Sequence, residues 1–176
     1  MITLVAAIAK NNCIGKNGEL PWNIPEDMKR MRAITLGKVL IMGRRTWESI
    51  PANRRPLPNR TNVVITSDTT YTLPNGVEKY SNVSEAIAAH AQEEIVGFGG
   101  ERIFTEMMPM ADVLEITHVD QTVDGDAFFP VIDPSIWKEV WREDHEGFSF
   151  VRYTKSQILN NKSQTNNNKQ TTNFEN

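Results

Sequence analysis

The sequence lacks several features that would place it outside ordinary soluble proteins. It has one cysteine, Cys13, among 176 residues, so no internal disulfide and no cysteine-based zinc site can form, which fits a reducing cytoplasm. It contains no run of about 20 apolar residues that would cross a membrane. A formal net charge of −3 argues against a nucleic-acid partner, because such proteins usually present a basic face. We therefore expect a cytoplasmic protein with neither a membrane nor a nucleic acid as partner.

Common signatures of nucleotide binding and hydrolysis are also missing. There is no GxGxxG, no GxxxxGK[ST] and no GxSxG, so the usual dinucleotide fingerprint, the P-loop and the hydrolase nucleophile elbow are absent. The three histidines, His90, His118 and His145, lie far apart and show no ligand spacing. We expect no metal site.

Short apolar runs alternate with helical patterns along the chain. Runs at 2–9, 38–43, 62–66, 93–99, 113–119 and 148–154 predict strands, and several are apolar at consecutive positions, as strands covered on both faces are. Helices are predicted over 25–35, 44–50, 84–92 and 100–111, the third with an alternative start at 81 or 82. This order predicts an α/β fold with a mostly parallel sheet. We expect the last strand, which follows a loop WREDHEGFS (141–149), to pair antiparallel at the sheet edge.

The two ends of the chain differ in composition. MITLVAAIAKNN is apolar for only nine residues before Lys10 and has no basic segment ahead of it, so we interpret it as a buried strand and not as a signal peptide. Residues 157–176 are polar and rich in asparagine, with little to bury. We predict one domain over 1–156 and a disordered polar tail over 157–176.

An acidic residue, Asp27, occupies a position where an apolar one is expected. If Pro25 opens a helix, Asp27 falls on the same side as Ile24, Met28 and Met31. An acid in the first helical turn is favoured by about 0.3–1 kcal/mol whatever its function, so a structural role stays open. A desolvated carboxylate nevertheless needs hydrogen-bond partners, which favours a ligand. The solvent-facing side is predicted to hold Glu26, Lys29, Arg30 and Ala33.

Two predicted strand ends have the residues that phosphate groups need. In VLIMGRRTWESI (39–50) a strand runs into a glycine, two arginines and a threonine at the start of a helix. In EIVGFGGERIF (94–104) three glycines precede a helix and let a ligand approach the backbone closely. Alternatively, the arginines are ordinary surface residues, and the glycines serve close packing of a helix on the sheet. Two such ends in one small sheet favour a dinucleotide over a mononucleotide.

Taken together, these segments resemble dihydrofolate reductases. LVAAIAKNNCIG, LPWNIPED, VLIMGRRTWESI, RPLPNR, FGGERIF, EITHV and DGDAFFP occur in the order and spacing of that family, from Met1 to about Lys155. The resemblance implies an eight-stranded, mainly parallel sheet with an antiparallel C-terminal strand and a cleft that divides it. It also implies NADPH-dependent reduction of 7,8-dihydrofolate to 5,6,7,8-tetrahydrofolate, which supplies one-carbon metabolism and thymidylate and purine synthesis, in a monomer that antifolates inhibit.

On the substrate side, the resemblance implies a pterin pocket around Asp27, whose two oxygens match the 2-amino and N3 donors of the pterin. Thr117 would brace Asp27, Trp22 would hold a bridging water, and Leu20 would end a mobile lid. Arg60 would clamp the α-carboxylate of the glutamyl tail. Further substrate contacts are expected from Val5, Ala6, Met28, Met31, Ile50 and Leu57. At position 31 the family usually has an aromatic residue, and methionine offers a softer surface.

On the cofactor side, the resemblance implies that Arg44 and Ser67 bind the 2′-phosphate and so select NADPH over NADH. Gly99 and Gly100 resemble a pair joined by a non-proline cis peptide bond. The other implied cofactor contacts are Ala7, Ile14, Gly15, Leu20, Gly43, Arg45, Thr46, Thr66, Phe98, Glu101, Arg102, Ile103 and Phe104.

Two other functions stay open on the residues alone. A pteridine or flavin-precursor reductase of the same fold would keep the cofactor residues but would not need Asp27 or Arg60. A non-catalytic nucleotide-binding module is the second alternative. A carboxylate on an apolar helix face argues against both, because neither needs an acid that faces an amidine-like ligand edge.

Overall fold

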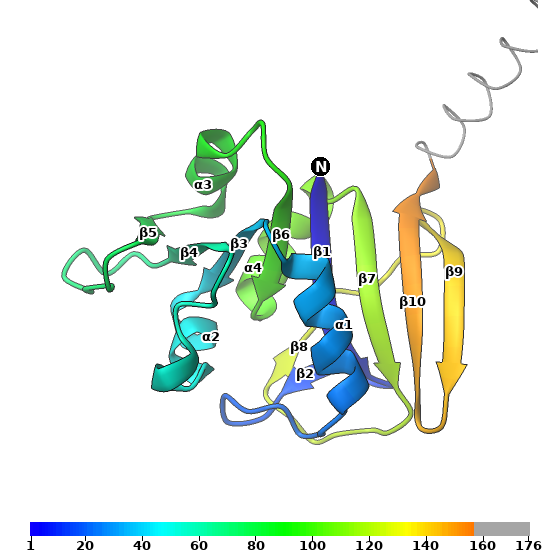
Figure 1. Ribbon diagram of the computed structural model, residues 1–176. Coiled ribbons are helices and arrows are strands. Elements are labelled where there is room, and N and C mark those ends of the chain that lie inside the picture. The colour runs from blue at the N-terminus through cyan, green and yellow to red at the C-terminus, as the bar shows by residue number, and fades with distance from the viewer. Residues whose placement is uncertain (157–176) are drawn as a thin grey trace, which may run out of the picture.

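A central sheet organises residues 1–156, the part of the chain that the computed structural model describes (Figure 1). The predicted polar tail, 157–176, lies outside the described residues. The sheet has eight strands, and one of them, β10 (Phe148–Lys155), runs opposite to the other seven, which confirms the predicted sheet. In order across the sheet the strands are β5 (Val77–Tyr80), β4 (Thr61–Ile65), β3 (Val39–Gly43), β6 (Ile95–Gly99), β1 (Ile2–Ala9), β7 (Val113–Val119), β10 (Phe148–Lys155) and β9 (Trp137–His145).

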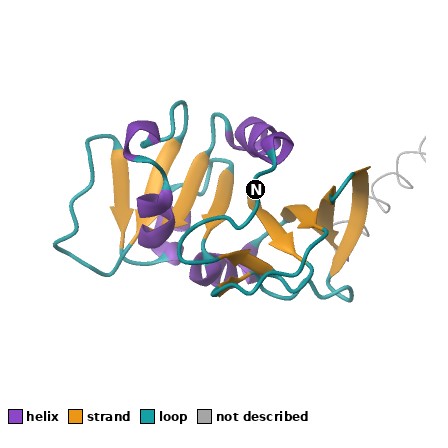
Figure 2. Ribbon diagram, turned by 90° about the horizontal axis from the view of Figure 1, so that it is seen from below, coloured by secondary structure: helices purple, strands orange, loops and turns teal. Residues whose placement is uncertain are grey.

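Helices cover both faces of this sheet (Figure 2). Residues of α1 (Pro25–Thr35) and α2 (Arg44–Ser49) pack in one apolar cluster, and residues of α3 (Val83–Ala89) and α4 (Glu101–Met107) pack in another on the opposite face. Two short 3₁₀ turns, η1 (Ala52–Arg54) and η2 (Met108–Met110), follow α2 and α4. A small ribbon of β2 (Cys13–Gly15) and β8 (Ala127–Phe128) lies beside the sheet.

The inner strands are buried on both faces, which explains their continuous apolar runs. Each residue of β3 from Val39 to Met42 is fully buried, and β4 is buried from Asn62 to Ile65. Side chains of this kind must alternate between the two apolar clusters, because successive residues of a strand point to opposite faces.

The C-terminal hairpin differs from the prediction. The segment expected to be a loop over 141–149 lies largely in β9, which is the edge strand, so β10 is one strand in from the edge. Beyond Trp137 the residues of β9 are all exposed and mostly charged, so its sequence carries no alternation of buried and polar positions. Its pairing with β10 is fixed by a tight turn in which Gly147 has a φ of 81°.

Smaller differences have local causes. The structure adds β5, whose four residues are too few to give a strand pattern. The helix predicted to reach residue 111 ends at Met107 and continues as a 3₁₀ turn, because Pro109 has no N–H to donate within a helix. The third helix begins after Asn82, whose side chain accepts from the backbone N–H of Glu85.

No helix among residues 1–156 is both long enough and apolar enough to cross a membrane.

Candidate active site

The predicted site residues gather at the carboxyl ends of the parallel strands, where open α/β sheets bind ligands. The first turn of α2 follows β3 directly, Thr66 and Ser67 follow β4, and α4 follows β6. The helix α1 lies across the sheet beside β1 and β7 (Figure 1). This arrangement separates a side around α1 from a side around α2 and α4.

On the α1 side, Asp27 is bound to Thr117. The threonine is 1% exposed on β7, opposite Ala7 of β1, and its Oγ1 donates a hydrogen bond of 2.5 Å to Asp27 Oδ1. The predicted contact between these two residues is therefore present, across 90 positions of sequence. It holds Oδ1 in place and leaves acceptor capacity on both carboxylate oxygens for a ligand.

The surroundings of Asp27 favour its neutral form. Burial raises the pKa of the Asp27 carboxyl above its ordinary value, while the Thr117 hydroxyl and the Arg30 charge oppose that rise. A ligand that offers N–H donors or a positive charge would stabilise the carboxylate in this position.

The predicted apolar contacts lie near one another on this face of the sheet. Val5 belongs to the buried cluster of the α1 side, and Met31, Ile50 and Leu57 pack against that cluster. Phe98, predicted as a cofactor contact, packs against the same cluster.

Two predicted substrate residues lie differently from the rest. The side chain of Ala6 packs with the cluster on the opposite face, so it can offer only its backbone to a ligand on the α1 side. Met28 is 42% exposed at the start of α1.

Arg60 is held in place by three protein acceptors. Its Nε donates to Thr35 Oγ1 at 2.8 Å, its Nη2 to the Arg32 carbonyl at 3.0 Å and its Nη1 to the Pro58 carbonyl at 2.6 Å. A guanidinium has five N–H groups. Arg60 therefore keeps one free N–H on each terminal nitrogen for a ligand.

On the other side, two strand ends meet at glycines. A Cβ on Gly100 would lie 3.4 Å from Thr46 Oγ1, and a Cβ on Gly43 would lie 3.4 Å from Ile103 Cγ1. Gly99 has a φ of 101°, and the peptide bond between Gly99 and Gly100 is cis, as predicted. At these positions the strand ends and the first turns of α2 and α4 approach each other so closely that a larger side chain would meet a neighbour.

Arg44, the first residue of α2, directly follows Gly43 and already has protein partners. Its Nη1 is 3.0 Å from Asp68 Oδ2, its Nε is 3.8 Å from Glu48 Oε1, and its guanidinium lies over the ring of Tyr71. The side chain is 41% exposed, so part of it remains open to a ligand. Ser67, the other residue expected at the 2′-phosphate, is exposed and immediately precedes Asp68.

Four predicted cofactor residues in α4 differ in what they can offer. Ile103 and Phe104 are buried in the core of the opposite face, so only their backbone can contact a ligand. Glu101 accepts from the backbone N–H of Phe128, and Arg102 pairs with Glu106 on the exposed surface. Among the remaining predicted residues, Ile14 packs against the same core and Arg45 is exposed.

The segment expected to be a lid, residues 14–20, begins in β2 and is attached to the loop that precedes β8. The backbone N–H of Asn17 lies 3.1 and 3.2 Å from the two carboxylate oxygens of Asp126, and Lys16 pairs with Asp124 at 3.6 Å. Leu20, in this segment, is 53% exposed.

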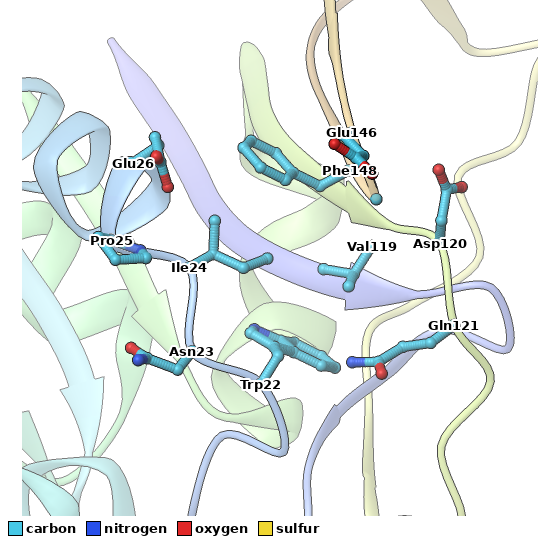
Figure 3. Close-up of a pocket in the computed structure, with 11 residues that line it drawn as sticks. Trp22, Asn23, Ile24, Pro25, Glu26, Val119, Asp120, Gln121, Glu146 and Phe148 are labelled. Atoms are coloured by element: carbon cyan, nitrogen blue, oxygen red, sulfur yellow. The ribbon is translucent and has the colours of Figure 1, made fainter.

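Trp22 follows the lid and lines a cavity of about 380 Å³ (Figure 3). In Figure 3 the ring extends toward Gln121, with its nitrogen on the opposite side. The Nε1–H is buried, and no described group accepts a hydrogen bond from it. The cavity is bounded by residues 22–26, 119–121 and 146–148 and does not include Asp27 or Thr117, so we do not assign the pterin to it.

Comparison with known proteins identifies the family. The family model described as dihydrofolate reductase matches residues 1–158. The chain belongs to the dihydrofolate reductase family. It is 45% identical to the dihydrofolate reductase of Neisseria meningitidis serogroup A over 161 residues, which cover 88% of this chain and 98% of the relative. It is 40% identical to dihydrofolate reductase type 3 of Salmonella typhimurium over 146 residues, or 82% and 88% of the two chains.

A solved structure of this family has the same fold. The dihydrofolate reductase of Enterococcus faecalis, in complex with NADP(H) and RAB-propyl, superposes with a TM-score of 0.79 and 34% sequence identity, over 89% of this chain and 96% of that chain. NADPH is the cofactor of the family. The two strand ends that the sequence analysis assigned to a dinucleotide thus belong to an NADPH-dependent oxidoreductase family.

The side chain of Arg30 lies elsewhere than the helical pattern of the sequence predicted. Arg30 was expected on the solvent-facing side of α1, but its side chain is only 15% exposed and lies against Phe150 and Trp141. It is drawn inward by Glu115, an acid on the otherwise apolar strand β7. The signal that could have found this pair was the glutamate in VLEITHV, two positions before Thr117.

No group of three or more histidine, cysteine, aspartate or glutamate side chains within residues 1–156 is arranged to hold a metal ion.

Proposed function

We propose that this chain reduces 7,8-dihydrofolate to 5,6,7,8-tetrahydrofolate, with the pterin bound in the cleft between α1 and β7. The observation that carries this proposal is the partly buried carboxylate of Asp27, which is braced by the buried Thr117. A flavin-precursor reductase or a nucleotide-binding module has no use for an acid in this place. The family to which the chain belongs is named for the proposed activity.

The substrate is recognised at both ends. Asp27 accepts hydrogen bonds from the 2-amino and N3 groups of the pterin, and the two remaining N–H groups of Arg60 bind the carboxylate of the glutamate tail. Met31, Ile50 and Leu57 contact the apolar middle of the molecule. The methionine replaces a flat aromatic surface with a flexible one.

NADPH binds at the strand ends between α2 and α4. Gly43 and Gly100 let its phosphates approach the backbone there, and the partly exposed Arg44 offers a charge for a phosphate. When bound, NADPH supplies the hydride that C6 of the pterin receives.

The part of Asp27 in the reaction is electrostatic. It binds the edge of the pterin ring that is far from N5, so its negative charge favours a protonated pterin without touching N5 directly. The buried Nε1–H of Trp22 needs an acceptor, and a water molecule held there would link the protein to the ring. Leu20 and the rest of the lid exclude bulk water from the site.

The direct test is an assay with protein, NADPH and dihydrofolate, followed by the decrease in absorbance near 340 nm. We expect rapid oxidation of NADPH that depends on dihydrofolate and that the Asp27→Asn variant performs poorly at neutral pH. Oxidation of NADPH with another pteridine but not with dihydrofolate would contradict the proposal.

We further propose that residues 1–156 form the catalytic domain and that folate analogues compete with dihydrofolate for its binding site. We also propose that the enzyme works in the cytoplasm as a monomer. Sedimentation velocity of the full chain with and without ligand tests whether it is a monomer.

A further inference from the structure

Three charged residues form a cluster beside the Asp27 site. Glu115 lies on β7, and its Oε2 is 2.5 Å from Nη2 of Arg30 on α1. Its Oε1 is 2.6 Å from Nε of Arg152, which is its cross-strand neighbour on β10. The carboxylate is 5% exposed, so both of its oxygens are bound by arginines away from water.

The cluster is built into the fold around Arg30. The guanidinium of Arg30 lies 4.8 Å from the ring centroid of Phe150 and 5.4 Å from that of Trp141. Phe150 pairs with Thr117 in the register of β7 and β10. Stacking on aromatic rings and an ion pair with a buried acid fix Arg30 more firmly than a surface pair would.

The geometry places this cluster next to the Asp27–Thr117 pair. Arg30 follows Asp27 by three positions on α1, so their side chains lie on neighbouring parts of the helix surface. Glu115 precedes Thr117 by two positions on β7, so both point to the same face of the sheet. Arg30 therefore lies between the two elements that hold the catalytic carboxylate.

We propose that Arg30, fixed by Glu115 and Arg152, is an electrostatic positioning residue that sets the pH range over which the Asp27 site works. The effect of Arg30 on turnover rests on the proposed reduction of dihydrofolate. The effect of Arg30 on the protonation of Asp27 does not depend on that proposal.

The direction of the effect follows from charge. The proton that the reaction needs adds one positive charge to the Asp27–pterin pair, whichever of the two partners carries it. A neighbouring guanidinium opposes that charge, and it opposes protonation of Asp27 alone in the same way. Removal of Arg30 should therefore let the site hold its proton to higher pH.

Removal of a positive charge from the cluster and removal of its negative charge should shift the pH dependence in opposite directions. It carries a net charge of +1, because two arginines face one glutamate. Arg30→Met removes a positive charge, keeps an unbranched apolar stem and leaves Glu115 paired with Arg152. Glu115→Gln removes the negative charge and leaves two arginines. The first variant should move the pH dependence up and the second should move it down.

The experiment uses two measurements on the same variants. NMR of the Asp27 carboxyl carbon in protein without ligands gives its titration midpoint. Single-turnover oxidation of NADPH by dihydrofolate gives the pH profile of the rate. For Arg30→Met we expect a higher titration midpoint of Asp27. At pH 9 this variant should keep a fraction of its maximal low-pH rate that is about three to ten times larger than the fraction the natural protein keeps. Glu115→Gln should shift both measurements in the opposite direction.

Matched variants separate charge from packing. Arg30→Lys keeps the charge and should leave both measurements near those of the natural protein. Lys155→Met makes the same charge change at the last residue of β10, where the lysine donates to the Pro109 carbonyl. This variant should also leave the titration midpoint and the pH profile unchanged. If Glu115→Gln does not fold, as judged by near-ultraviolet circular dichroism, Arg152→Gln should shift the midpoint in the direction of Arg30→Met, but less.

The outcomes are distinct. An unchanged midpoint and profile in folded Arg30→Met would overturn the proposal, and so would an equal shift in Arg30→Lys, since packing and not charge would then be the cause. If the natural protein does not reduce dihydrofolate, the proposed function fails, but the titration of Asp27 still decides the role of Arg30.

Discussion

The two sides of the cleft are built by different means. On the cofactor side, glycines and the first turns of α2 and α4 form two strand ends, and within each strand end the residues follow one another directly in the sequence. On the substrate side, one carboxylate is positioned by side chains that come from distant parts of the chain, such as Thr117 at 90 positions and Glu115 at 85 positions from their partners on α1.

This difference has a physical consequence. Closely packed glycine positions do not tolerate added volume, whereas a buried carboxylate responds to every charge near it. Substitutions on the substrate side should therefore change the reaction and its pH dependence, and substitutions on the cofactor side should change affinity.

Asp27→Asn should produce the largest effect. Turnover at neutral pH should fall by a factor on the order of 10²–10⁴, which is typical for the loss of acid–base assistance. The affinity for NADPH, measured by fluorescence titration, should stay within about twofold, because the substitution lies on the other side of the cleft. A comparable loss of NADPH affinity would show that the two sides are not independent.

The same variant should not lose stability. Because the folded-state pKa of Asp27 is raised, the buried carboxylate weakens the fold at pH values above that pKa, and the effect disappears below the ordinary pKa of the unfolded chain. At pH 8 the melting temperature of Asp27→Asn without ligands should equal or exceed that of the natural protein. A lower melting temperature would mean that the carboxylate has a structural role at the helix start.

Arg44→Ala tests the cofactor side. We expect NADPH to bind more weakly by about 1–3 kcal/mol, the usual contribution of a hydrogen bond to a charged group, and NADH to bind nearly as before. Asp68→Asn is the matched control, since it removes the carboxylate that competes with a phosphate for Arg44, and it should tighten NADPH binding slightly. Equal losses for both cofactors would place Arg44 away from the 2′-phosphate.

Arg60→Lys tests the far end of the substrate side. Lysine keeps the charge but loses the fork and the contacts to Thr35 and Arg32. The KM for dihydrofolate should rise roughly tenfold, or about 1.4 kcal/mol, while a dihydropterin without the glutamate should be almost unaffected. If both substrates lose alike, Arg60 only supports the fold.

Removal of residues 157–176 should have the smallest effect. These residues contribute to neither side of the cleft in our proposal, so turnover and melting temperature should remain nearly unchanged. A loss of stability above about 1 kcal/mol would show that the tail contacts the domain.

The two sides also differ in what could be predicted from the sequence. The apolar runs predicted β1 and β7 to the residue, and the start of α1 followed from Pro25. The glycine-containing strand ends were visible because all their residues are adjacent in the chain. The edge strand β9 was missed because its exposed, charged residues obtain their strand conformation from pairing with β10.

The position of Arg30 shows the limit on the substrate side. A helical wheel assigns it to solvent by its charge and angle, and only the presence of Glu115 on β7 brings it inward. A pair of this kind depends on how α1 lies on the sheet, which no local pattern contains. Asp27 could be identified as unusual, but its partners on β7 required the family resemblance or the structure.

The most direct test of the proposed role of Asp27 is the pH dependence of single-turnover NADPH oxidation by the Asp27→Asn variant. If Asp27 acts by favouring a protonated pterin, acid in solution can replace that contribution, so the rate should rise as the pH falls and approach that of the natural protein. A folded variant that works normally at neutral pH, or that shows no recovery in acid, would contradict the assignment of Asp27 as the residue that controls protonation.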